Sequence, residues 1–234
     1  MNRLATISPN GRSLAGSNAA RSTLVVLADP HSPSAEAYRS LAANLQFAYS
    51  DRQLQTIGVT STAQGEGKST TVANLAIALA QSGRRVIVID ADLRRPGQHT
   101  LFRIAHEQGF SNVLQGERLE LPLQDTDVAG VRVLTSGPLP ANPIEVLASR
   151  RFDQALALAR EQADFVLVDT PPAGALADVA VVAPRLEGML LVVSAGRTKR
   201  ELAQRAREQL ERVNANLLGV VLVDVPTNAK LYQY

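Results

Sequence analysis

The 234-residue chain contains no cysteine and no tryptophan, and aromatic residues make up only 4% of it. Without cysteine, this chain offers no disulfide bond, no thiolate zinc site and no iron–sulfur ligation. The three histidines, His31, His99 and His106, lack the spacing of a metal site. No apolar run approaches the ~20 residues that cross a bilayer, and the first residues lack the apolar core of a secretion signal. We therefore expect a cytoplasmic chain with no direct membrane insertion, which a partner would have to bring to a membrane.

A strong excess of one charge is also missing, because 24 lysines and arginines nearly balance 22 acidic residues, for a net charge of +2. Such a balance produces no global field that would attract nucleic acid or an anionic surface, so we expect no nucleic-acid partner. An apolar content of 45% and a charged content of 20% are typical of globular domains. The length allows a sizeable core.

From residue 54 onward, strand and helix patterns alternate. The strand patterns are near-continuous runs of Val, Ile and Leu, as in parallel strands that are buried on both faces. They fall at residues 54–61, 84–90, 131–136, 164–169, 188–194 and 216–224, and the main helical patterns at 68–82, 144–163 and 198–213. This alternation predicts a doubly wound, mostly parallel α/β sheet. Ligands of such sheets bind beyond the carboxyl ends of the strands.

The remaining residues suggest four parts of the chain. A helix is expected at residues 34–49, with Ala37, Leu41, Leu45 and Ala48 as its apolar stripe. The segment 23–28 is expected to be a short edge strand or an extended arm. The parts are a flexible tail (1–22), an arm with a helix (23–50), an α/β core (51–226) and a C-terminal tail (227–234).

A glycine-rich turn joins the first core strand to the helical pattern at 68–82. It fits the second half of the P-loop pattern G-x-x-x-x-G-K-[ST], although Thr62 stands at the first glycine. Glycines let backbone N–H groups surround phosphate oxygens at a helix N-terminus. Lys68 would bridge the β- and γ-phosphates of a nucleotide, and Ser69 would bind Mg²⁺. The plainer alternative is a turn with a surface lysine. The predicted nucleotide-binding residues are Gln64, Gly65, Glu66, Gly67, Lys68, Ser69 and Thr70.

Carboxylates stand at the ends of two further strands. Asp169 ends the strand at 164–169, the pattern of a carboxylate that orients a magnesium-bound water. Asp90 ends the strand at 84–90 and Asp92 follows it, with Arg94 close by. If this strand lies next to the P-loop strand, both carboxylates face the same phosphates. Phosphoryl transfer to a hydroxyl needs a base in line with the γ-phosphate, and one of them could supply it. Ordinary strand-end turns are the alternative.

These motifs occur in the order of a known family. The stretches "AQGEGKST" (63–70), "VIVIDADLRRP" (86–96) and "VLVDTPP" (166–172) resemble the three Walker motifs of bacterial tyrosine kinases (BY-kinases). "SPSAEAYRSLAANLQF", "LTSGPLPANPIEVLAS" and "LLGVVLVDV" resemble further segments of that family. The resemblance covers the chain from about residue 24 to its end. It implies a P-loop NTPase fold of the MinD/ParA-like, SIMIBI type.

The resemblance implies ATP and Mg²⁺ as cofactors. It also implies autophosphorylation between subunits on the tail tyrosines Tyr232 and Tyr234, and control of exopolysaccharide or capsule polymerisation and export. Asp90 would be the base, and Asp92 and Asp169 would hold magnesium together with Ser69. The implied partners are a membrane-embedded chain-length-determinant (Wzz-like) activator, which would hold the chain at the inner face of the membrane, and a phosphotyrosine phosphatase.

The chain departs from the family in the helix motif Glu-x-x-Arg-x-x-Arg, through which members form homo-oligomers. Glu36 and Arg39 are present, but Ala42 stands at the second arginine. Two other functions therefore stay open. One is a MinD/ParA-type positioning ATPase, although Ala63 stands where that class carries an extra lysine. The other is a nucleotide-dependent scaffold of the polysaccharide export machinery.

Overall fold

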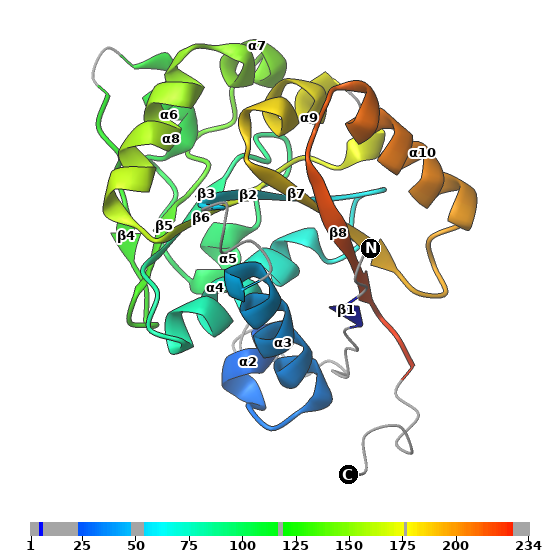
Figure 1. Cartoon of the computed structure of the whole chain (residues 1–234). Helices are drawn as coiled ribbons and strands as arrows, with labels where there is room; N and C mark the ends of the chain where they lie inside the picture. Colours follow the sequence, from blue (N-terminus) through cyan, green and yellow to red (C-terminus); the bar gives the residue numbers. More distant parts are fainter. Residues whose placement is uncertain (1–4, 7–22, 48–53, 117–118, 176, 227–234) are drawn as a thin grey trace.

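The computed structural model describes residues 5–6, 23–47, 54–116, 119–175 and 177–226. These residues form one sheet with helices on both faces (Figure 1). The sheet has the strand order β1-β8-β7-β2-β6-β3-β5-β4, and every pair except β4–β5 is parallel. The strands are β1 (Ala5–Thr6), β2 (Thr56–Ser61), β3 (Val86–Asp90), β4 (Gln124–Asp125), β5 (Val131–Leu134), β6 (Phe165–Asp169), β7 (Gly188–Ser194) and β8 (Leu217–Val223). The predicted doubly wound, mostly parallel α/β fold is confirmed.

Most helices join consecutive strands of this sheet and cover its two faces (Figure 1). They are α2 (Val25–Ala28), α3 (Pro33–Phe47), α4 (Lys68–Gln81), α5 (Gln98–Phe102), α6 (Phe110–Gln115), α7 (Pro143–Ala148), α8 (Arg151–Gln162), α9 (Ala177–Val182) and α10 (Arg200–Arg212). Two short 3₁₀ turns, Ala173–Ala175 and Ala183–Arg185, flank α9. No helix among the described residues is both long and apolar enough to cross a membrane.

Two apolar clusters fill the space on either side of the sheet, and β3 contributes to both. Val86 and Val88 belong to the cluster that contains α2, α3 and α4, whereas Ile87 and Ile89 belong to the cluster that contains α6 to α10. Successive side chains of a strand point to opposite faces. A strand covered on both sides therefore needs apolar residues at every position, which is the pattern seen in the sequence.

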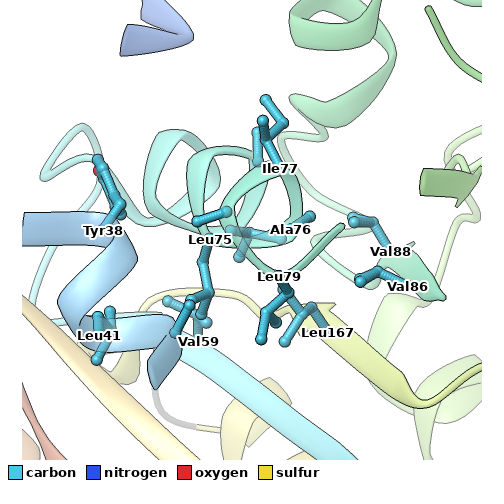
Figure 2. Packing of buried hydrophobic residues seen from close by; sticks show 14 of the residues in the cluster. Tyr38, Leu41, Val59, Leu75, Ala76, Ile77, Leu79, Val86, Val88 and Leu167 are labelled. Carbon is cyan, nitrogen blue, oxygen red and sulfur yellow. The ribbon is translucent and has the colours of Figure 1, made fainter. Parts of the chain in front are cut away.

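The helix α3 packs against α4, the helix that follows the glycine-rich turn. Figure 2 shows Leu75 and Leu79 of α4 directed toward the sheet, and Tyr38 and Leu41 of α3 beside them. Tyr38 is buried, and this burial raises the pKa of its hydroxyl to about 12. Ala42 is buried as well, against the same cluster. The contact fixes α3 against the helix whose first residues are Lys68 and Ser69.

The segment 23–28 is helical, so its prediction as a strand or extended arm is wrong. Residues 25–28 form the single turn α2, and Leu24, which precedes it, and Val26 enter the core. The buried side chain of Asn74 in α4 accepts the Val26 N–H at 3.1 Å and donates to the Thr23 carbonyl at 3.0 Å. A tertiary hydrogen bond thus decides a conformation that the local apolar run left open.

The helix predicted at 144–163 is interrupted. The structure has α7 and α8 there, separated at residues 149–150. The guanidinium of Arg185 donates to the carbonyls of Leu147 (2.9 Å), Ala148 (2.8 Å) and Ser149 (3.1 Å). Since the last carbonyls of a helix have no partner within it, Arg185 satisfies the end of α7 and permits the break.

Two further expectations differ from the structure. Ala5 and Thr6, in the part expected to be a flexible tail, pair in parallel with Val221 and Leu222 of β8; the other residues of 1–22 lie outside the described residues. The strand β3 does not neighbour β2, because β6 lies between them. The helix expected at 34–49 spans Pro33–Phe47, with residues 48 and 49 outside the described residues.

Candidate active site

The glycine-rich turn between β2 and α4 has the backbone of a phosphate-binding loop. Gly65 and Gly67 have φ values of 77° and 86°, a region that side-chain-bearing residues rarely adopt. Gly67 immediately precedes the first residue of α4, Lys68. The N–H groups of the first helical turn have no partner within the helix, and they carry the positive end of the helix dipole. The loop therefore presents backbone donors and a lysine to an anion.

A buried carboxylate, Glu66, closes this loop on itself. It accepts hydrogen bonds from the Thr62 hydroxyl at 2.6 Å and from the Ala63 N–H at 2.9 Å. It also accepts a hydrogen bond from the hydroxyl of Thr198, which lies between β7 and α10. Thr62 occupies the position of the missing first glycine, so its hydroxyl contributes a contact that glycine lacks. The Glu66 carboxylate is thus hydrogen-bonded inside the protein, and it links the loop to the segment between β7 and α10.

Lys68 is the shared counterion of two carboxylates. Its Nζ lies 2.7 Å from Asp92 Oδ2 and 3.1 Å from Asp169 Oδ1, and all three side chains are at most 8% exposed. Burial alone would lower the pKa of Lys68, but the charges of Asp169 and Asp92 raise it above its usual value. Lys68 Nζ is also 3.1 Å from Ser69 Oγ. The structure therefore brings together Lys68, Ser69, Asp92 and Asp169, although β3 and β2 are not neighbours.

Asp90 completes a group of three buried carboxylates. It is opposite Asp169 in the β3–β6 register and is fully buried. Its Oδ2 accepts the N–H groups of Gly97 and Gln98, both at 2.9 Å. Its Oδ1 accepts the more distant N–H of Asp92 at 3.3 Å. Burial, and then the charge of Asp169, raise the pKa of Asp90 to about 7, against these hydrogen bonds and the charge of Lys68. Asp90 thus changes protonation near neutral pH.

Arg94 and Asp178 join the two carboxylate-bearing loops. The guanidinium group of Arg94 donates to both carboxylate oxygens of Asp178. Nε donates to Oδ2, and Nη2 donates to Oδ1 at 3.2 Å. The Asp178 side chain is 0% exposed, and that of Arg94 is 46% exposed. Arg94 follows Asp92 in the chain, and Asp178 follows Asp169. Arg94 therefore holds the loop after β3 against the segment after β6.

Gln98 is a residue of the site that the sequence motifs did not indicate. It is the first residue of α5 and is fully buried. Its Nε2 donates to Asp169 Oδ2 at 2.7 Å and to the Ser69 carbonyl at 3.1 Å. Glutamine is common on surfaces and belongs to no motif here, so only its tertiary position reveals it. Its location shortly after the Asp90–Asp92 pair is the single sequence hint.

The remaining predicted residues lie in the phosphate-binding loop, on α3 or outside the described residues. Glu36 and Arg39 form an exposed ion pair within α3 at 3.0 Å, and Arg39 also donates to the Pro30 carbonyl. The predicted acceptors, Tyr232 and Tyr234, lie outside the described residues. Gly65, Gly67 and Glu66 lie in the loop as predicted, and Gln64 and Thr70 border it at either end.

The donor set fits a nucleotide with a magnesium ion. Mg²⁺ prefers oxygen ligands, and Ser69, Asp92 and Asp169 supply a hydroxyl and carboxylates beside the lysine. Gln98 Oε1 is buried in the same place without a hydrogen-bond partner, a further oxygen available to a bound group. Across the described residues, no three His, Cys, Asp or Glu side chains are grouped to hold a metal by themselves. Nucleotide phosphates would therefore have to complete such a site.

Comparison with known families places this site in context. The family model described as ParA: NUBPL iron-transfer P-loop NTPase matches residues 53–223. The match covers the sheet from β2 to β8 and the phosphate loop. Because the chain has no cysteine, it offers no thiolate for the iron transfer in that description. The match therefore supports the fold and the nucleotide site.

Similar proteins are tyrosine kinases. The chain is 40% identical over 200 residues to the tyrosine-protein kinase YwqD of Bacillus subtilis (strain 168), covering 85% of this chain and 84% of the relative. It is 34% identical over 199 residues to the tyrosine-protein kinase CpsD of Streptococcus agalactiae, covering 84% and 86%. The crystal structure of the chimerical protein CapA2B2 superposes with a TM-score of 0.86 at 32% identity, over 97% of this chain and 96% of that one. The chain is a ParA-like P-loop NTPase and belongs to the family of bacterial tyrosine-protein kinases.

Proposed function

We propose that this protein transfers the γ-phosphoryl group of ATP to tyrosine hydroxyls, its own included. The observation that carries the proposal is the arrangement around Lys68, whose Nζ contacts Asp92 and Asp169 while Asp90 lies opposite Asp169. A protein that only switches with its bound nucleotide needs the P-loop lysine and a strand-end carboxylate. Transfer of a phosphoryl group to a hydroxyl additionally needs a base, and Asp90, with a pKa near neutrality, can supply it.

The roles divide between binding and proton transfer. The N–H groups of the loop 64–70 and the ammonium of Lys68 bind and orient the phosphates. Ser69, Asp92 and Asp169 would hold Mg²⁺, which when bound neutralises charge that develops on the phosphoryl oxygens. Glu66 keeps the loop in shape through Thr62 and Thr198. Together these residues fix the γ-phosphate in one position.

Asp90 is the proposed base. A tyrosine hydroxyl has a pKa of ~10, so it needs an acceptor for its proton as its oxygen attacks. With a pKa of about 7, Asp90 is partly ionised at neutral pH and is a stronger base than an ordinary aspartate. Its Oδ1 carries only the longer hydrogen bond, from Asp92 N–H at 3.3 Å, and is the oxygen we assign to the proton.

The acceptor tyrosines are Tyr232 and Tyr234 in this proposal. Of the four tyrosines in the chain, Tyr38 is excluded because its ring is packed into the core with 3% of its surface exposed. A tail that reaches a neighbouring subunit would make phosphorylation intermolecular. Oligomerisation through Glu36 and Arg39 of α3 is part of this proposal.

The cellular role rests on the resemblance to the family. We assign the kinase to exopolysaccharide or capsule polymerisation and export. Its activator would be a membrane-embedded chain-length-determinant protein that holds it at the inner face of the membrane, and a phosphotyrosine phosphatase would reverse its action. Relatives such as the tyrosine-protein kinase etk of Escherichia coli are longer, and this chain matches 29% of etk. A separate activator would supply what the additional length supplies there.

The test is phosphotyrosine formation by the purified chain with ATP and Mg²⁺, with and without the cytosolic segment of the activator. Mass spectrometry should locate phosphate on Tyr232 or Tyr234, and the signal should vanish in Lys68→Ala. The double variant Tyr232→Phe/Tyr234→Phe should lose autophosphorylation but still consume ATP on an added tyrosine peptide. Hydrolysis of ATP that DNA or lipid stimulates, without any phosphotyrosine, would contradict the kinase and favour a positioning ATPase.

A further inference from the structure

Gln98 binds three parts of the active site at once. Its backbone N–H donates to Asp90 Oδ2 at 2.9 Å, and its side-chain Nε2 donates to Asp169 Oδ2 at 2.7 Å and to the Ser69 carbonyl at 3.1 Å. One residue thus connects the end of β3, the end of β6 and the first turn of α4. It does so with a side chain that no solvent reaches.

The orientation of the amide follows from its partners. A carboxylate oxygen and a backbone carbonyl are both acceptors, so the group that faces Asp169 and Ser69 has to be the NH₂. The reverse orientation would place Oε1 against the charge of Asp169. The amide oxygen is thereby turned away from both acceptors, and the assignment of its two ends does not depend on any other contact.

In this orientation the amide oxygen, Oε1, has no hydrogen-bond partner. Gln98 Oε1 is buried and accepts no hydrogen bond in the structure. Buried polar atoms in native proteins are almost always paired, and leaving one unpaired is unfavourable. Because Oε1 and Nε2 are bonded to the same carbon, this free acceptor lies in the part of the site that holds Asp169 and Ser69. A bound group with a donor to offer would satisfy it there.

Close packing supports the same assignment. A Cβ added to Gly97 would lie 3.3 Å from Ser69 Oγ, so the start of α5 lies directly on the serine that is assigned to the metal. Gly97 and Gln98 already hold Asp90 through their backbone N–H groups. An apolar side chain at position 98 would fill the space equally well, and packing alone does not explain a buried amide.

We propose that Gln98 is a positioning residue of the magnesium–phosphate site. Its Nε2 holds Asp169 Oδ2, so that Asp169 Oδ1 is the oxygen that would be offered to the metal, and its unpaired Oε1 would accept a hydrogen bond from a donor of the bound metal–nucleotide group. This inference rests on the proposed assignment of Ser69, Asp92 and Asp169 to Mg²⁺. It goes beyond it in naming a side chain that tunes the affinity for the metal.

The experiment measures how much Mg²⁺ strengthens ADP binding, and it needs no kinase activity. ADP is titrated calorimetrically into the full chain in EDTA and in millimolar Mg²⁺, and the ratio of the two affinities is compared between variants. Gln98→Met keeps the length and removes both polar atoms, whereas Gln98→Asn keeps the amide and withdraws it by one methylene. Both should lower the ratio about tenfold and leave ADP binding in EDTA within a factor of two.

Gln115→Met on α6 makes the same substitution at an exposed position and is the control, since the Gln115 amide donates to the Ser111 carbonyl of its own helix, away from the carboxylates of the site. It should keep the wild-type ratio. A wild-type ratio in both Gln98 variants would overturn the proposal, as would an equal loss of ADP binding in EDTA, which indicates a structural role. If one variant fails to fold, the other decides. A wild-type chain whose ADP affinity ignores Mg²⁺ would instead refute the metal assignment in the proposed function.

Discussion

Replacing Asp90 with asparagine should stabilise the nucleotide-free protein, and increasingly so as the pH rises. The pKa of Asp90 is raised to about 7 in the folded protein, from 3.8 when exposed. The folded state therefore binds this proton more tightly than the unfolded state does. The free energy of unfolding falls as the pH rises from about 4 to about 7, and the loss is complete above pH 7. An asparagine side chain does not titrate, so the variant escapes this loss.

The size of the effect follows from the shift and the hydrogen bonds. A shift of about three pKa units corresponds to about 4 kcal/mol, an upper limit for the penalty on the ionised carboxylate. The amide oxygen of asparagine can still accept the N–H groups of Gly97 and Gln98. The N–H of Asp92, now at 3.3 Å from Oδ1, would lose its acceptor, at a cost of about 1 kcal/mol. We expect a net gain of about 3 kcal/mol at pH 8.5.

Urea unfolding in EDTA, without nucleotide, at several pH values between 5 and 8.5 measures this difference. The stability difference between Asp90→Asn and the wild type should grow by about 3 kcal/mol over this range, because two of the three units of the shift lie above pH 5. Asp127→Asn, at an exposed aspartate, is the control and should show no such trend. A difference that is flat or that shrinks with pH would mean that Asp90 is not a high-pKa carboxylate. The proposed base would then lose its main support.

Three other contacts give tests of the same kind. Lys68→Met removes the counterion of two buried carboxylates and should cost about 3–5 kcal/mol in urea unfolding at pH 8; Mg²⁺ added together with ADP should restore more of this than ADP alone, and no difference would argue against a metal between these carboxylates. Thr198→Val removes a donor to Glu66 and an acceptor of the Ser194 N–H and should cost about 2 kcal/mol, whereas Thr198→Ser should cost little; equal losses in thermal unfolding would point to packing instead. Arg94→Met leaves Asp178 buried without its cation and should cost about 2 kcal/mol, less than a fully buried pair because Arg94 is half exposed. The double variant with Asp178→Asn should recover most of that loss, and additive losses would contradict the pairing.

The sequence indicated the phosphate loop and the strand-end carboxylates because their signals are local. Apolar runs mark buried parallel strands, and the carboxyl ends of such strands share one edge of the sheet. Asp90, Asp92 and Asp169 could therefore be assigned to one edge of the sheet, whereas their proximity depends on the strand order. The condition that the strand at 84–90 lies next to the strand at 54–61 is not met, because a strand some 75 residues later in the chain is inserted between them.

What the sequence did not indicate depends on partners far along the chain. Asp178 is 84 residues from Arg94, and Gln98 is 71 residues from Asp169. The end of α7 depends on Arg185, and the helical turn α2 depends on Asn74, 48 residues from Val26. No periodicity within one element encodes these contacts. The details of the site that resisted prediction are the polar cross-links that hold it, whereas the motifs that bear the chemistry were visible.

The charges of the stretch "IDADLRRP" (89–96) imply that Lys68 changes its partner when a nucleotide binds. Asp92 and Asp169 share Lys68 as their counterion. A phosphate that takes Lys68 away leaves these carboxylates buried without a counterion and in repulsion with the phosphate itself. A divalent cation that arrives with the nucleotide removes both penalties. Arg94 cannot take over this role, since its guanidinium is bound to Asp178. From the pairing of Lys68 we therefore expect the nucleotide affinity to depend strongly on Mg²⁺.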